Sequence, residues 1–158
     1  MEQVQRLLMK ASKNDLLEYC KGYVSNRMSR FAGAISAAQS DANKETKSSA
    51  GDKHETGRAM AQLETENNSK HLAEAKKLNA VLSQIDPEKK ITSIELGAFV
   101  KTNLGNYFIA ISAGKTHLFG DEVFLISPAS PIGQHFLGKK EGDTVSFNQQ
   151  TIAIQEVH

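Results

Sequence analysis

Ser48-Ser49-Ala50-Gly51-Asp52-Lys53-His54-Glu55 separates two long segments that have the apolar spacing of helices. Its small and polar residues favour a change of chain direction. Asp52 and Glu55 are three residues apart, so they point the same way in a first helical turn. At the tip of a hairpin they offer two oxygen ligands to a hard cation such as Mg²⁺. The same spacing is typical of a helix start, with Asp52 as the cap and Glu55 reaching back. Both interpretations remain open.

The segment before this stretch carries apolar residues at steps of seven. They are Leu17, Val24, Phe31 and Ala38, with Cys20, Met28 and Ile35 between them. This spacing predicts an amphipathic helix with a heptad-like seam. Asn14 or Asp15 is its expected N-cap. No proline occurs before Pro87, so an arm of about 30 residues, roughly 45 Å long, is permitted.

The segment after this stretch has the same character. Its apolar residues at helical spacing are Ala59, Leu63, Leu72, Ala75, Leu78, Leu82 and Ile85, and Asp86-Pro87 ends the run. Large apolar residues are absent from residues 39–56, which we predict to be an exposed turn region. Two arms of similar length predict an antiparallel helical hairpin that buries one seam against the other. A parallel dimeric coiled coil is the alternative.

Past Lys90 the spacing becomes that of strands. We expect strands at 92–102, 107–112, 117–119, 122–126, 143–147 and 151–157. Ser130 and Pro131 predict the cap and first residue of one short helix, which Gly138 ends. The predicted fold class is α+β: a helical hairpin in residues 1–88 with its tip near 41–57, and a small antiparallel sheet with one helix in residues 89–158.

Composition limits the compartment and the partners. The 158 residues have a formal net charge of +1, so the whole chain is not built for a polyanion. Cys20 is the only cysteine, which excludes an intrachain disulfide and a cysteine-based zinc cluster. We find no apolar run long enough for a membrane span and no signal-peptide core. We therefore expect a cytoplasmic protein.

A basic stripe on the first arm has two interpretations. Lys21, Arg27, Arg30, Lys44 and Lys47 include pairs three residues apart, which share a helix face. Such a stripe either faces phosphates or is simply the solvated side of the helix. Spacing alone does not separate the two.

Two segments resemble, in order along the chain, the Gre family of bacterial transcript-cleavage and elongation factors, which bind RNA polymerase. Residues 127–143, Ser-Pro-Ala-Ser-Pro-Ile-Gly-Gln-His-Phe-Leu-Gly-Lys-Lys-Glu-Gly-Asp, are similar to that family's Ser-Pro-hydrophobic, Leu-hydrophobic-Gly-Lys and Gly-Asp signature. Gly51-Asp52-x-x-Glu55 resembles the Gly-Asp-x-x-Glu at the tip of the family's hairpin. The resemblance covers most of residues 15–158.

The resemblance implies an FKBP-like carboxyl-terminal domain and a hairpin that enters the secondary channel of RNA polymerase. There Asp52 and Glu55 would help to hold Mg²⁺ for cleavage of backtracked RNA near its 3′ end. Ser130, Pro131 and Ile132 would lie in or near the docking surface. Two carboxylates do not complete a Mg²⁺ shell. We therefore expect no tight Mg²⁺ binding and no catalysis by the protein alone, which would stimulate the polymerase's own cleavage activity.

Departures from the family pattern define the alternatives. Lys53 stands where an apolar residue is usual, and Thr56-Gly57-Arg58 replaces an Asn and aromatic surroundings. Lys53 and Arg58 either contact RNA phosphates or weaken the field of the carboxylates. The alternatives are a non-cleaving regulator in the same channel and a coiled-coil adaptor without a polymerase target. Prolyl isomerisation is disfavoured, because an FKBP-like fold does not by itself carry FKBP activity. That activity uses an aromatic-lined pocket, and the sheet domain has no tryptophan and a single tyrosine, Tyr107.

Overall fold

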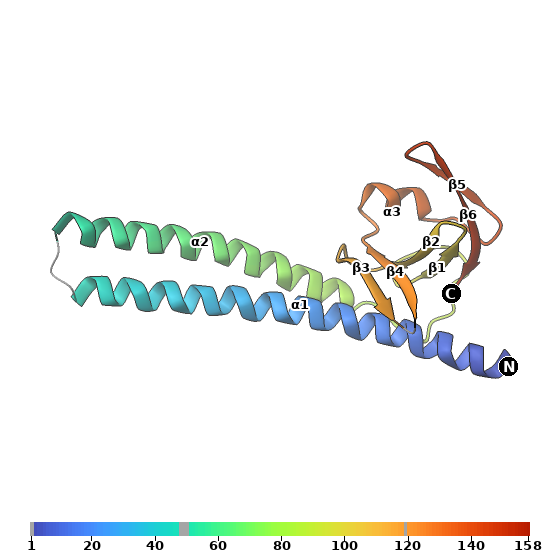
Figure 1. The fold of residues 1–158 in the computed structure, drawn as a ribbon, viewed down its shortest axis with the longest axis horizontal. Coiled ribbons are helices and arrows are strands. Elements are labelled where there is room, and N and C mark those ends of the chain that lie inside the picture. Colours follow the sequence, from blue (N-terminus) through green and yellow to red (C-terminus); the bar gives the residue numbers. More distant parts are fainter. Residues whose placement is uncertain (1, 48–50, 119) are drawn as a thin grey trace. The chain divides into compact units, whose positions relative to one another are not determined.

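The computed structural model describes the backbone of residues 2–47, 51–118 and 120–158, and the side chains of residues 13–41, 43, 55–118 and 120–158. The described chain forms a helical hairpin and a six-stranded sheet with one short helix (Figure 1). This confirms the predicted α+β fold class. The chain divides into two compact units, Met1–Lys21 with Val81–His158, and Gly22–Ala80. The predicted domain boundary at 88/89 stays a prediction.

Helix α1 spans Glu2–Lys47 and helix α2 spans Gly51–Leu82. Helix α1 is longer than predicted, and α2 begins earlier than predicted and ends three residues before Ile85, the last residue of its predicted seam. The predicted N-cap at Asn14 or Asp15 is wrong, because α1 continues through both residues. Asn and Asp cost only about 0.7 kcal/mol in a helix interior, and burying Leu16 and Leu17 immediately after them outweighs that cost.

The predicted turn region, 39–56, is also too wide. Helical backbone reaches Lys47 and resumes at Gly51. The residues on either side are mostly Ala, Lys, Glu, Gln and Asn, which do not stop a helix, and no proline is present. The loss of large apolar side chains therefore did not mark the ends of the two helices.

The seam of the hairpin follows steps of seven in both helices. In α1 the predicted seam residues Leu17, Val24, Phe31 and Ala38 are all buried. In α2 the buried series is Leu82, Ala75 and Ala61, with half-buried Asn68 between the last two. Within the Gly22–Ala80 unit the helices lie side by side (Figure 1), and the rings of Phe31 and His71 stack at 5.1 Å.

Two residues predicted for the α2 seam are exposed. Leu63 keeps 59% of its surface accessible, and Ala59 is exposed as well. Ala61 takes the buried position because it continues the series of seven from Ala75, whereas Ala59 and Leu63 fall outside that series. Apolar residues at helical spacing occur in both series, so the spacing alone did not show that Ala61, and not Ala59 or Leu63, is buried.

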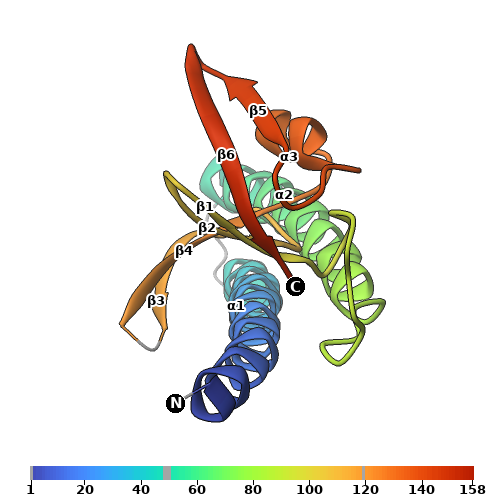
Figure 2. The same ribbon diagram turned by 90° about the vertical axis from the view of Figure 1, so that its right-hand side faces the viewer.

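The sheet has the strand order β3-β4-β2-β1-β6-β5 (Figure 2). Its strands are β1 Phe99–Thr102, β2 Gly105–Ile109, β3 Gly114–Leu118, β4 Asp121–Ile126, β5 Thr144–Phe147 and β6 Gln150–Val157. The short helix α3 spans Pro131–Phe136, as predicted, and packs beside β5. The expected strand at 92–102 is real only from Phe99, because Gly97 (φ +92°) turns the chain before it.

One strand pair departs from the expected antiparallel pattern. Strands β2 and β4 are parallel, so the sheet is mixed. The chain leaves β2, forms β3 at the edge and returns as β4 between the two. Composition explains the order: β4 buries Val123 and Leu125 in the interior of the sheet, whereas β3 carries exposed Lys115 and His117 and tolerates an edge.

A buried core cluster draws its residues from β1, β2, α3, β5, β6 and the segment that precedes β1. Its buried members are Ile91, Ile94, Ala98, Val100, Tyr107, Ile109, Phe136, Val145, Ile152 and Ile154. Phe136 of α3 and Phe124 of β4 both contact the ring of Tyr107. Burial raises the pKa of the Tyr107 phenol. This core fixes where α3, and the signature around it, lies on the sheet.

Candidate functional site

The acidic pair lies at the start of α2, directly after residues 48–50, which the structure does not describe. Because α2 begins at Gly51, the backbone of Asp52 and Glu55 belongs to its first turns. The side chain of Glu55 is exposed. The side chains of Asp52 and Lys53 lie outside the described residues. A carboxylate on an exposed first turn is stabilised by the amino-terminal end of the helix dipole and remains open to an external ligand.

Arg58 follows Glu55 on the same helix. It is exposed and three residues further along, so it borders the same face. Neither residue takes part in an ion pair between described side chains. The backbone of Asp52, Glu55 and Arg58 therefore lies on neighbouring turns of α2.

The fit of this pair to a metal is partial. In the described part of the chain, no three His, Cys, Asp or Glu side chains gather in a way that holds a metal ion. Two carboxylates supply oxygen ligands of the kind Mg²⁺ takes, but an octahedral shell needs more. Two carboxylates therefore do not form a metal site by themselves.

A cluster that the sequence did not predict lies further along the hairpin. The guanidinium of Arg27 is 5.6 Å from the Tyr23 ring centre and 5.7 Å from that of Phe31, and Arg30 is 5.0 Å from Phe31. Arg27 also donates to the Tyr23 hydroxyl at 3.1 Å. These two arginines are therefore held on aromatic rings. The steps of four between Tyr23, Arg27 and Phe31 were the available signal.

Ser130 is the N-cap of α3. Its hydroxyl donates to the carbonyl of Ser127 at 2.7 Å and accepts from the amide of Gly133 at 3.1 Å. The hydroxyl is thus already occupied by the local fold. Pro131 is exposed at the first helical position, where its missing N–H costs nothing. Ile132 is half-buried against the core.

Gly133 explains another part of the signature. A Cβ there would lie 2.1 Å from the carbonyl oxygen of Ser127, so no other residue fits without a shift of the backbone. Gly138 (φ +81°) ends α3, as predicted, and the Asp143 carboxylate accepts from the amide of Lys140 at 2.8 Å. Most of the carboxyl-terminal signature therefore has a structural reason.

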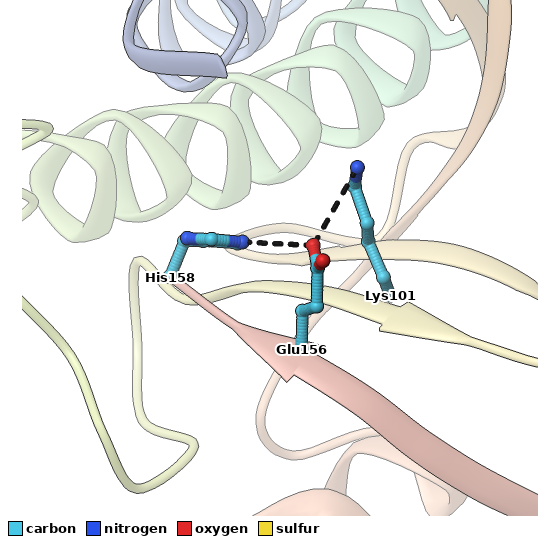
Figure 3. Close-up of polar contacts among 3 residues, drawn as sticks. All are labelled: Lys101, Glu156 and His158. Atoms are coloured by element: carbon cyan, nitrogen blue, oxygen red, sulfur yellow. Dashed lines mark hydrogen bonds and ion pairs between the residues drawn. The ribbon is translucent and has the colours of Figure 1, made fainter. Parts of the chain in front are cut away.

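The sheet also carries an exposed charged cluster across β1 and β6 (Figure 3). Glu156 Oε2 lies 3.1 Å from His158 Nε2 and 3.6 Å from Lys101 Nζ. The bond to His158, with help from Lys101, lowers the pKa of the Glu156 carboxyl. With two potential metal ligands, both half-exposed, the cluster fits a surface staple between strands better than a binding site.

Comparison with known proteins does not identify a family for this chain. No family model matches the chain, and no curated protein matches it. Among solved structures, the chain is similar to the transcription factor Gfh1, with 17% identity, 87% of this chain and 92% of that chain covered, and a TM-score of 0.34. At that TM-score we transfer no property of Gfh1 to this chain. Among the described residues, no helix combines the length and apolar character needed to cross a membrane.

Proposed function

We propose that this protein is a Gre-like transcription elongation factor that inserts its hairpin tip into the secondary channel of RNA polymerase and promotes Mg²⁺-dependent cleavage of backtracked RNA. The observation that carries the proposal is the position of Gly51-Asp52-x-x-Glu55 on the first turns of the second helix, next to the hairpin turn, with Glu55 exposed. The fold of the sheet unit, with the signature of residues 127–143 around α3, supports it.

In this proposal Asp52 and Glu55 act together with acidic residues of the polymerase. Their carboxylates contribute oxygen ligands from one side, while the polymerase and the RNA phosphate contribute the others. Mg²⁺ bound there would activate water and offset charge on the leaving oxygen of the RNA backbone. The hairpin delivers the pair; the protein alone has too few ligands to act.

Arg58 separates cleavage from a non-cleaving role. It is an exposed cation on the turn next to Glu55. If it contacts an RNA phosphate, it strengthens the complex and Arg58→Gln lowers cleavage. If it weakens the field of the carboxylates, the same change raises cleavage. The second case favours another candidate function, a regulator that occupies the channel without stimulating cleavage.

Docking of the sheet unit is proposed at the start of α3. Pro131 is exposed and rigid, and Ile132 is half-buried beside it, so this turn presents a fixed surface. Ser130 supports that surface through its cap instead of offering a free hydroxyl. Binding by RNA polymerase at this surface would be lost with Pro131→Glu.

The test is RNA cleavage in stalled, backtracked elongation complexes of the cognate polymerase. Three proteins are compared: wild type, Asp52→Ala/Glu55→Ala, and the charge-matched control Glu64→Ala/Glu66→Ala from the same helix. We expect the first double variant to lose cleavage by about 100-fold or more, because a metal ligand contributes several kcal/mol. The control should keep it.

Binding to polymerase is measured in parallel by competition. Wild-type cleavage that disappears in a still-binding Asp52→Ala/Glu55→Ala variant supports the proposal. Binding without cleavage by wild type identifies the non-cleaving regulator. Absence of binding excludes both polymerase roles and leaves the coiled-coil adaptor.

A further inference from the structure

Lys13 is the one buried charged residue among the described side chains, with 6% of its surface exposed. It lies on α1, and its ammonium donates to the backbone carbonyl of Lys89 at 3.3 Å. The two residues are 76 positions apart and belong to the same compact unit. Removing an ammonium from water is costly, and a long bond to a neutral carbonyl restores only part of that cost. Burial accordingly lowers the pKa of Lys13.

The segment opposite Lys13 is acidic. The charges that act on it come from Asp86, Glu95 and Glu88, which favour its protonated form, and from Lys89, which opposes it. The carboxylates thus hold the cation electrostatically while its burial works against them. The cost of burying the ammonium and its attraction to the carboxylates therefore oppose each other, and the contact is not a strong ion pair.

The loop that accepts Lys13 holds its own shape. Asp86 accepts the amide of Glu88 on its side chain at 2.9 Å and the amide of Lys89 on its carbonyl at 3.2 Å. The ammonium of Lys89 turns to Glu95, 2.8 Å away. These bonds close within residues 86–95 and leave the carbonyl of Lys89 for Lys13. The bond from Lys13 to the Lys89 carbonyl therefore joins α1 and the 86–95 loop, and neither element needs this bond to form.

We propose that the buried ammonium of Lys13 weakens the contact between α1 and the preformed 86–95 loop, so that this contact opens while both elements stay folded. When the contact opens, the Lys13 ammonium regains water and stays near the three carboxylates. The free energy needed to open the contact is therefore not prohibitive. This inference does not depend on the proposed function.

The test uses hydrogen exchange of the full-length protein, read by mass spectrometry over residues 86–95 at pH 7. Lys13→Met keeps the length of the side chain and removes the charge, and Lys13→Glu reverses it. We expect exchange to slow about fivefold in Lys13→Met, since replacing a buried charge by an apolar side chain is often stabilising. We expect it to accelerate about 30-fold in Lys13→Glu, which buries a carboxylate against carboxylates. Lys21→Met, at an exposed lysine of the same helix, should change nothing.

A second readout is pH. The folded-state pKa of Lys13 lies below its unfolded value of 10.5, so the open state binds more protons between the two values. After correction for intrinsic rates, wild-type protection of the loop should rise with pH through that window, and Lys13→Met should not show the rise. If Lys13→Met loosens the loop as much as Lys13→Glu does, Lys13 makes an ordinary stabilising bond and the proposal that its charge weakens the contact is excluded. Unchanged exchange in both variants excludes it as well.

Discussion

The acidic tip of the hairpin and the signature around α3 both resemble the same family, but the fold uses them differently. Around α3, Ser130 caps the helix, Gly133 fits against Ser127, and Asp143 closes a turn. At the tip, Glu55 is exposed and joins no ion pair between described side chains. One motif is required by packing and the other, as far as its side chains are described, is not.

This difference changes what each resemblance is evidence for. Residues that the fold requires recur wherever the fold recurs, so the α3 signature is evidence for the fold. Packing gives no such reason for the exposed carboxylate of Glu55, although the start of a helix favours a carboxylate wherever it occurs. The tip is therefore the better evidence for function. Three substitutions test this contrast, and a fourth tests the charged cluster on β1 and β6.

Gly133→Ala should have the largest effect on stability. Its Cβ would lie 2.1 Å from the Ser127 carbonyl oxygen, so the α3 turn must move, at a cost of about 3 kcal/mol or more. Urea unfolding of the full chain measures this. Gly33→Ala on α1, where a Cβ meets nothing within 4 Å, is the matched control and should stabilise by up to about 1 kcal/mol. Equal effects at the two glycines would contradict the packing explanation.

Ser130→Ala should destabilise by about 1 kcal/mol, because the Gly133 amide loses its cap. Ser130→Thr should restore most of the loss, since threonine also caps. Chemical unfolding gives the stability, and polymerase competition gives the binding. A variant with unchanged stability and lost binding would move Ser130 from the fold to the docking surface.

Glu156→Gln tests the charged cluster on β1 and β6. The folded-state pKa of Glu156 is below its unfolded value, so its stabilisation is present above about pH 4.5 and disappears as pH falls through the folded pKa. We expect the variant to lose less than about 1 kcal/mol at pH 7, because the partners are half-exposed. At pH 2 the wild type and the variant should be equally stable. A difference that persists there would point to packing instead of charge.

Glu55→Ala should have the smallest effect on stability, within about 0.5 kcal/mol, because the side chain is exposed. Thermal unfolding checks this in the same preparation that is used for the cleavage assay. A loss as large as that of Ser130→Ala would make Glu55 a capping residue and would remove the contrast between the two motifs.

Much of the local structure was predictable from the sequence. The seam from Leu17 to Ala38 follows from spacing alone, because a buried helix face needs apolar residues at a fixed period. Ser130, Pro131 and Gly138 defined α3, because caps and breakers act on their own backbone. The spacing of Asp52 and Glu55 likewise indicated the start of a helix, and α2 begins at Gly51.

Non-local contacts decided the rest. Burial of Leu16 and Leu17 carries α1 through Asn14, and the partner helix selects Ala61 over Leu63 in α2. Competition among strands for the interior places β4 between β2 and β3. No local pattern buries Lys13, whose acceptor lies 76 residues away. The apolar period of a helix and the residues that start or end it depend on neighbouring residues. Helix register, strand order and the burial of a charge depend on free energies of contact between distant segments.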